Sequence, residues 1–425
     1  MTAASKTPRR RQRRRPQTNL IALAAATVIV LFLRRPDQFL HPYIWIEDGY
    51  VTLKSFAEHG VGILTEPVNG QYLFASKLLS YIAFRTSVPW TPEIQVVLAA
   101  LLTCAVVLAV ALSPTHLPWP FLCALGTLLV PLGPEVFAVS AYGSWWAGLL
   151  LLLVPLWRSK QQGLRWFCLL LGGLSSPIIV PIACIQALRA VCDRDRVEWM
   201  TTAICALIAI VQIATLWNSP ILASLQAPTV VGVAADVVRF VGSFFVGRKG
   251  GYFVTGAIAL VALASVAVMV RDRLDRYFVL TLAMFVGACM ASTARLQISM
   301  IHQFLGGPRY FFYPFVLITW VGIWLAAKSS RRICFAMLVV YLVAIAIAAP
   351  GMSWRHNAID WRAHLAICAS SDGLSIPVLW WNGSPSEIHW VHFLGQQCKA
   401  FIDQSLFAMP SATSQSLPTP QPPNQ

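Results

Sequence analysis

Two adjacent carboxylates, Glu47 and Asp48, follow a run of large aromatic residues within residues 41–50, whose sequence is HPYIWIEDGY. A carboxylate held at a membrane surface can act as a general base toward a hydroxyl group. Asp and Glu also cap helices for structural reasons alone. The pair therefore has two interpretations: a catalytic base, for which Asp48 is the preferred residue, or a helix cap.

Two basic residues follow this pair in the same polar segment. Lys77 lies within an apolar stretch that runs from Tyr72 to Phe84, and Arg85 comes directly after it. Cations at these positions can bind a phosphate group, or their long side chains can extend to lipid headgroups. The stretch predicts a helix, and helical spacing of apolar residues near Tyr50 predicts a second helix that lies in the membrane interface.

Further candidates occur later in the chain. Arg309 precedes an apolar span and is followed by Tyr310, so it is the first choice for a phosphate ligand, with an ordinary interface anchor as the alternative. Glu135 is a second carboxylate at a predicted turn, and Trp145 and Trp146 can stack on a sugar ring. The alternative for these three is a turn carboxylate with tryptophans of the aromatic belt, and this alternative is favoured.

A metal site and a disulfide are weaker possibilities near the C-terminus. His356, Asp360 and His364 are spaced four residues apart, so one helix face could hold a divalent metal, although solvated polar residues are the preferred interpretation. Cys368 and Cys398 form a disulfide if their segment faces an oxidising compartment, or remain free thiols otherwise.

The composition shows why these polar residues stand out. Hydrophobic residues make up 57% of the 425 residues and charged residues only 12%, whereas a soluble globular protein has about 25% charged residues. Segments such as Val96 to Leu112 and Tyr252 to Val270 contain no charge and are about as long as a membrane-spanning helix. The sequence predicts an all-α polytopic membrane protein with about ten to eleven transmembrane helices.

Basic residues set the predicted orientation. Six arginines lie between Arg9 and Arg15, and we interpret residues 1–18 as a cytoplasmic tail that orients the first span, in preference to a segment that binds nucleic acid or anionic lipid. The transmembrane domain is predicted at 19–349, with a first outer loop at 34–92 and another outer segment at 218–250. A small outer segment at 350–409 and a disordered tail at 410–425 follow.

One hydrophobic block conflicts with this orientation. If the block from Trp166 to Ala190 crossed the membrane once, every later basic loop would face outward. Its centre, residues 172–177, has the sequence GGLSSP. We therefore predict two half-helices that re-enter the membrane, an arrangement that is possible where broken backbone is buried in protein.

The polar residues of the first outer loop and of three later segments resemble the GT-C superfamily of membrane glycosyltransferases. Within the loop, Pro42 to Pro92 is similar to a group of bacterial GT-C-like proteins. The residues that carry the resemblance are Glu47-Asp48-Gly49, Gly60, Pro67, Gly70-Gln71-Tyr72, Glu135-Val136, Trp145-Trp146, Gly173-Leu174-Ser175-Ser176-Pro177 and Gly307-Pro308-Arg309-Tyr310-Phe311. The chain departs from well-known members in having no large C-terminal domain.

The resemblance implies a sugar donor linked to polyprenyl phosphate and a glycan or lipid acceptor. The first-loop carboxylate would deprotonate the acceptor, and transfer would invert the anomeric carbon. The expected location is a bacterial inner membrane, with the N-terminus cytoplasmic and the C-terminus outside. The sequence has no Walker loop and no GxGxxG motif, which is consistent with a donor that carries no nucleotide.

Two other functions remain open. A lipid or sugar transporter also uses broken helices, but transporters carry charges inside their spans, whereas the acids here gather at predicted outer turns. A non-catalytic protein of envelope assembly is the third possibility, which only an activity measurement separates from the first.

The orientation makes a direct prediction. Alkaline phosphatase fused after Pro410 should be active in a bacterial host, because the inner loops hold the basic residues. An inactive fusion, together with an active cytoplasmic reporter at the same position, would contradict both the orientation and the broken helix.

Overall fold

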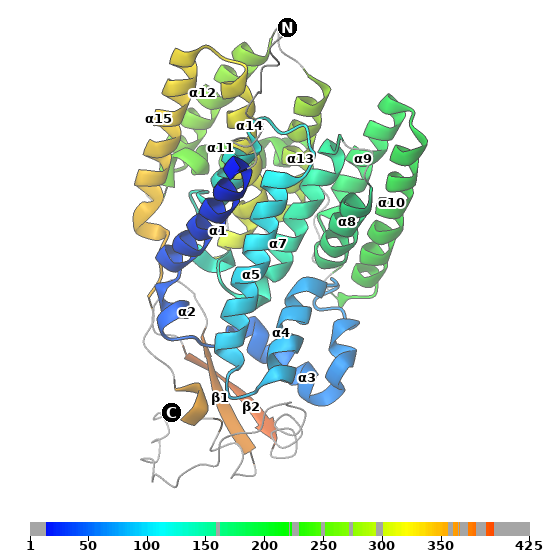
Figure 1. The fold of residues 1–425 in the computed structure, drawn as a ribbon, viewed down its shortest axis with the longest axis vertical. Coiled ribbons are helices and arrows are strands. Elements are labelled where there is room, and N and C mark those ends of the chain that lie inside the picture. Colours follow the sequence, from blue (N-terminus) through cyan, green and yellow to red (C-terminus); the bar gives the residue numbers. More distant parts are fainter. Residues whose placement is uncertain are drawn as a thin grey trace, which may run out of the picture.

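The computed structural model describes residues 14–158, 162–220, 222, 229–247, 251–271, 275–294, 301–355, 360–363, 365, 373–379 and 388–394. The proposed pair of Cys368 and Cys398, two of the three possible metal ligands, His356 and His364, and the tail 410–425 lie outside these residues. The outer loop lies at one end of the molecule, beside the β-hairpin, and the long helices extend away from it (Figure 1).

The chain is a multi-pass membrane protein. Within the described residues, six segments are long and apolar enough to cross a membrane. They are α5 (Thr91–Leu112), α10 (Arg196–Trp217), α12 (Tyr252–Val270), α13 (Arg276–Thr293), Pro308–Ala327 with α14 (Phe312–Ala327), and Arg331–Gly351 with α15 (Arg331–Ala348). Shorter apolar helices occur at Asn19–Arg34 within α1 (Arg14–Arg34), Ser140–Leu156 and Gly163–Ser175. The total of ten to eleven spans stays a prediction, because several predicted spans are broken into short helices.

The first outer loop contains both helices that its sequence predicts. A π-helical turn at Asp48–Leu53 continues into α3 (Lys54–His59), and α4 (Phe74–Thr86) covers the second predicted stretch. A short helix α2 (Pro36–Leu40) and a 3-10 helix at Gly60–Leu64 complete the loop.

The apolar chain between residues 120 and 156 forms irregular helices. Helix α6 (Pro120–Leu128) has only nine residues, and α7 (Gly143–Leu149) continues as a 3-10 helix that contains Pro155. Two further 3-10 turns, Pro134–Val136 and Ser140–Tyr142, connect α6 to α7. The carbonyls of Leu128, Val130 and Leu132, which α6 leaves without helical partners, all accept hydrogen bonds from the buried guanidinium of Arg34.

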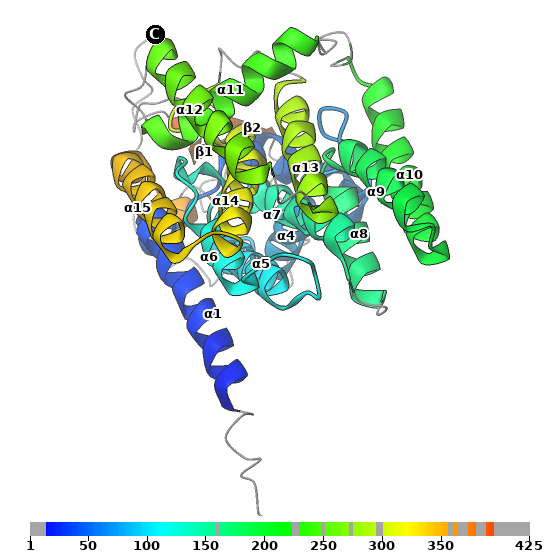
Figure 2. The ribbon, with the colours of Figure 1, turned by 90° about the horizontal axis from the view of Figure 1, so that it is seen from above.

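The predicted break is present, while the re-entry of the two half-helices into the membrane stays a prediction. Helix α8 (Gly163–Ser175) ends before Pro177, and α9 (Ile179–Asp193) begins after it. The two half-helices pack beside α10 on one side of the molecule (Figure 2). A Cβ atom at Gly172 would lie 2.8 Å from the carbonyl oxygen of Ala147, so this position needs glycine for close packing of α8 on α7.

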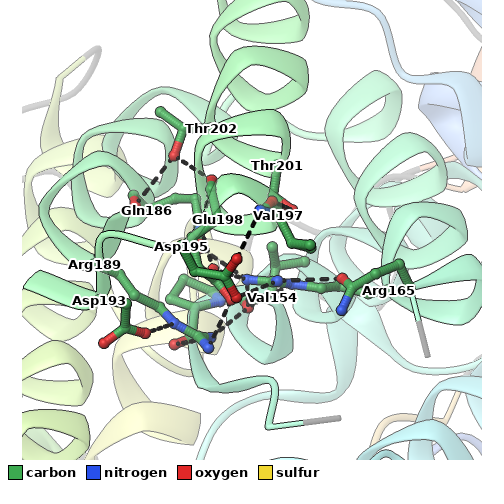
Figure 3. A network of polar contacts seen from close by, with 12 residues as sticks. Val154, Arg165, Gln186, Arg189, Asp193, Asp195, Val197, Glu198, Thr201 and Thr202 are labelled. Carbon is green, nitrogen blue, oxygen red and sulfur yellow. Dashed lines mark hydrogen bonds and ion pairs between the residues drawn. The ribbon is translucent and has the colours of Figure 1, made fainter. Parts of the chain in front are cut away.

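A buried ionic network holds the far ends of the half-helices together (Figure 3). Arg165 of α8 donates to both carboxylate oxygens of Glu198 on α10, at 3.0 and 2.6 Å, and to the carbonyl of Val154. Arg189 of α9 pairs with the same carboxylate at 2.9 Å and with Asp193 at 3.1 Å. The start of α8 and the end of α9 therefore lie together, as in a hairpin.

The predicted outer segment 218–250 contains a helix that the sequence did not indicate, α11 (Val230–Val246). The rings of Phe240 and Phe311 pack with centroids 4.9 Å apart, and Phe244 packs on Phe315 at 5.2 Å. Helix α11 thus lies against the start of α14, where it covers part of the membrane domain rather than forming a loop.

The prediction of an all-α fold is wrong for the C-terminal segment. Strands β1 (Gly373–Leu379) and β2 (Ile388–Leu394) form an antiparallel hairpin in which Gly373 pairs with Leu394 and Leu379 with Ile388. Apolar residues alternate along β1, which is the pattern of a strand with one buried face. Buried valines of the hairpin join the outer-loop residues in a second hydrophobic core, with Leu53, Phe56, Phe84, Val378 and Val391.

The buried network should dominate the stability of the α8–α9 hairpin. Replacing Glu198→Gln removes the carboxylate that the two buried guanidinium groups share and leaves Arg165 with none, while Arg189 keeps Asp193. We therefore expect a loss of about 3 kcal/mol or more in the free energy of unfolding. Arg362→Gln is the matched control, because its pair with Glu93 is exposed and is worth at most about 1 kcal/mol. Equal thermal shifts of the two purified variants in detergent would contradict this role.

Candidate functional site

A cavity of about 230 Å³ lies between the first outer loop and the membrane helices. Five parts of the chain form its wall: the outer loop, the start of α7, the tip of the α8–α9 hairpin, the end of α13 and the start of α14. Its polar or aromatic lining includes Glu47, Thr52, Ser76, Lys77, Tyr142, Ser144, Trp145, Ser175, Ser176, Ser292, Arg309, Tyr310 and Tyr313. Candidates that are far apart in the sequence, such as Glu47, Trp145 and Arg309, therefore share one site.

Two carboxylates, a guanidinium and a phenol form a cluster at this cavity. Arg309 pairs with Glu135 through its side chain, and its backbone amide donates to the other oxygen of the same carboxylate at 3.0 Å. The same guanidinium lies 3.8 Å from Glu47 and donates to the Tyr142 hydroxyl at 3.1 Å. Glu135 lies in the turn Pro134–Val136, in agreement with its interpretation as a turn carboxylate, but it is buried and pairs with Arg309.

Glu47 is the carboxylate that faces the cavity. Its Oε1 atom lies 2.9 Å from the Tyr142 hydroxyl, whereas its Oε2 atom is buried and has no hydrogen-bond partner among the described residues. Burial raises the pKa of Glu47 above its ordinary value, while Arg309 opposes this shift and the negative charge of Glu135 adds to it. A carboxylate with one unsatisfied oxygen and a raised pKa is suited to accept a proton.

Tyr142 connects the two carboxylates. Its hydroxyl lies 2.9 Å from both Glu47 and Glu135, and it accepts a hydrogen bond from the indole of Trp45 at 2.9 Å. A phenol has one proton, so it donates to one carboxylate at a time. The Trp45 bond fixes the position of the hydroxyl while leaving that choice open.

Asp48 lies behind the cavity rather than on it. It is 1% exposed, and its oxygens accept hydrogen bonds from Ser80 at 2.7 Å, Ser140 at 2.6 Å and the amide of Ala141 at 3.0 Å. Burial raises its pKa to about 6, although these three donors oppose the shift. Asp48 therefore joins the outer loop to the turn before α7, which is a positioning role.

Lys77 is the unpaired cation of the site. It lines the cavity, is 3% exposed, and its Nζ atom has no hydrogen-bond partner among the described residues. Burial lowers its pKa to about 8. A buried ammonium without a partner is costly unless a ligand supplies one.

The other predicted site residues divide into two groups. Trp145 and Tyr310 line the cavity with ring centroids 5.8 Å apart, and Tyr313 packs on Trp145 at 5.1 Å, so these rings form an aromatic wall. Trp146 is buried away from the cavity and donates to the carbonyl of Val136 at 2.7 Å. Arg85 is exposed and does not line the cavity.

In the part of the chain that the structure describes, no group of three or more His, Cys, Asp or Glu residues is placed to hold a metal ion. Asp360 is the one residue of the possible His356–Asp360–His364 site that falls within this part.

The sequence analysis did not single out Tyr142, or Trp45, which donates a hydrogen bond to it. It also missed the two serines that donate to Asp48. Tyr142 stands three residues before Trp145 in the sequence AYGSWW, so its position beside a candidate was visible. Its role depends on a turn that brings residue 142 next to residue 47, and the local sequence does not encode that contact.

No protein-family model, curated protein or solved structure matches this chain.

The buried Asp48 should make stability depend on pH. Because its pKa is raised to about 6 from 3.8, the folded state binds the proton more tightly than the unfolded state. This contribution is complete below pH 4 and is lost as pH rises through about 6, an effect of about 3 kcal/mol. The free energy of unfolding should therefore fall between pH 4 and pH 7 in the unmodified protein, and it should fall less in Asp48→Asn.

The control is Glu58→Gln, which changes an exposed carboxyl of α3. Its free energy of unfolding should fall with rising pH in parallel with that of the unmodified protein. If the Asp48→Asn curve is also parallel, the buried proton has no part in stability.

Proposed function

We propose that this protein is a membrane glycosyltransferase that moves a sugar from a polyprenyl-phosphate-linked donor to a glycan or lipid acceptor at the outer face of a bacterial inner membrane. The observation that carries the proposal is the unpartnered Oε2 atom of Glu47 in a cavity that also contains an unpaired cation and an aromatic wall. A base, a positive charge and a stacking surface are the parts that transfer from a phosphate-linked sugar requires.

Glu47 is the proposed general base. The acceptor hydroxyl oxygen forms a bond to the anomeric carbon as the bond from that carbon to the donor phosphate oxygen breaks. The bonding electrons leave with the phosphate, and the acceptor proton goes to Oε2 of Glu47. Attack from the face opposite the leaving phosphate inverts the anomeric carbon.

Glu135, Arg309 and Tyr142 hold and tune the base. Glu135 neutralises much of the charge of Arg309, so the guanidinium orients Glu47 at 3.8 Å without removing its basicity. The rings of Trp145 and Tyr310 offer an apolar face to the sugar, an arrangement that excludes water from the reacting carbon.

A transporter of lipid or sugar is the second candidate, because the α8–α9 break lines the cavity as in transporters with discontinuous helices. A transporter moves its substrate unchanged, so conversion of donor to product by the purified protein decides between the two. A non-catalytic role in envelope assembly predicts neither transport nor conversion.

The central variant is Glu47→Gln, which keeps the size of the side chain and removes its basicity. A general base contributes about 10²- to 10⁴-fold in rate, so we expect a loss of this size in kcat with a small change in KM. Transfer is measured with purified protein and a lipid-linked sugar donor, by mass spectrometry of the product.

Two matched variants accompany it. Glu58→Gln on the exposed face of α3 should leave transfer unchanged. Asp48→Asn should change activity only as far as it changes the amount of folded protein. Near-normal transfer by Glu47→Gln would exclude Glu47 as the base, and a large loss confined to folded Asp48→Asn would assign the base to Asp48.

A further inference from the structure

The cavity has a second polar region, separate from the Glu47 cluster, where the two half-helices meet. Ser175 and Ser176 end α8, and Pro177 and Ile178 lead into the 15-residue helix α9. All four residues line the cavity. The amide of Ile178, at the N-cap of α9, donates to no acceptor among the described residues. The amides of Ile179 and Val180 donate to the carbonyls of Ser176 and Pro177, and Pro181 has no N–H. The Ile178 amide is therefore the one donor that this end of α9 offers to the cavity, together with the positive pole of the helix dipole.

Lys77 supplies the independent observation that this region binds a ligand. The start of α4, which carries Lys77, is fixed to the hairpin tip because the amide of Ala75 donates to Ser175 Oγ at 3.0 Å. Ser76 is fixed in turn by Ser144, with their hydroxyl oxygens 2.8 Å apart. Lys77 is thus held rigidly at the cavity, buried, with no partner for its ammonium.

Arg309 is less suited to bind an anion. Its guanidinium pairs with Glu135, donates to Tyr142 and lies 3.8 Å from Glu47. An anion placed there would meet two carboxylates. Among the described residues, the Lys77 ammonium has no hydrogen bond or salt bridge to a carboxylate, and Glu66 acts on its charge only from a distance, so an anion there meets less repulsion than at Arg309.

We propose that Lys77 and the N-terminus of α9 form the subsite for the single phosphate of an isoprenoid phosphate lipid, and that Arg309 serves the base instead. The proposal rests on the proposed function for the identity of the donor. In this arrangement the leaving phosphate binds at the break between the half-helices, and the acceptor proton moves to Glu47. The negative charge and the proton that the reaction releases therefore go to different walls of one cavity.

This division has a chemical consequence. A sugar joined to a lipid phosphate is a phosphodiester with one negative charge, whereas the phosphate monoester that leaves carries nearly two at pH 7. The attraction to Lys77 therefore grows as the bond to the anomeric carbon breaks, which stabilises the transition state more than the donor. The released lipid phosphate should also bind more tightly than the donor.

The test measures binding rather than turnover. Purified full-length protein in phosphatidylcholine nanodiscs is titrated with geranylgeranyl phosphate and with geranylgeraniol, which has the same chain and no phosphate. We expect the phosphate to bind at least about tenfold more tightly, since a hydrogen bond to a charged group is worth this much. Equal affinities in the unmodified protein would overturn the subsite, and this comparison needs no variant.

The variants locate the effect. Lys77→Met and Lys77→Gln should lose the preference for the phosphate, and Lys77→Arg should keep most of it. Lys54→Met is the matched control, because Lys54 is exposed on α3 and does not line the cavity. Thermal unfolding identifies folded variants, and a folded Lys77→Met protein that retains the tenfold preference would refute the assignment.

Two further measurements test which kind of lipid supplies the phosphate and separate this proposal from the proposed function. Nanodiscs with phosphatidylglycerol should not displace geranylgeranyl phosphate, and displacement would assign the subsite to ordinary headgroups instead. Glu47→Gln should keep the phosphate preference while it loses transfer. If the preference depends on Lys77 but no donor is converted, the proposed function fails and the subsite stands.

Discussion

Lipid cannot hydrogen-bond a peptide group, so every break in a helix at membrane depth must find its partners inside the protein. This chain breaks its helices repeatedly between residues 128 and 178, and buried side chains supply the missing bonds. Arg34 accounts for three carbonyls after α6, and Arg165 and Arg189 bind the carbonyls of Val154 and Pro155. A buried arginine is costly, but a buried carbonyl without a hydrogen-bond partner is costly too. These arginines lie where such carbonyls need donors.

The same constraint places the cavity. Where the breaks lie near the outer loop, serines rather than arginines satisfy the backbone, as Ser175 does for Ala75. Small hydroxyl side chains leave space that guanidinium groups would fill. The irregular backbone therefore borders the cavity beside the first outer loop and contains the buried ionic network at its other end (Figure 3). The rigid core keeps the two half-helices together, and their free tip forms part of the cavity wall.

Much of this arrangement was predictable from local sequence, because its causes are local. The absence of charge predicted the long helices, Pro177 and its glycines predicted the break, and apolar spacing predicted α4. The roles of Glu47 and Asp48 were not predictable, since both are acidic and adjacent. They differ because consecutive residues of a helical turn point in different directions: Asp48 meets Ser80, Ser140 and Ala141, while Glu47 meets the cavity. Tyr142 and the partner of Arg309 likewise depend on contacts between residues about 100 or more positions apart.

The β-hairpin packs on the first outer loop, and this contact has a consequence for the order in which the protein is assembled. A Cβ atom at Gly49 would lie 2.5 Å from the side chain of Val378 and 3.3 Å from that of Val391, so the hairpin rests on the residue next to the acidic pair. The ribosome produces the acidic pair early and the hairpin more than 300 residues later. Until the hairpin has been made, the apolar residues around Phe56 and Phe84 lack their contacts with its valines. The core of the outer loop is therefore complete only when β1 and β2 have been made, and a chain that stops short of β1 lacks Val378 and Val391 from that core.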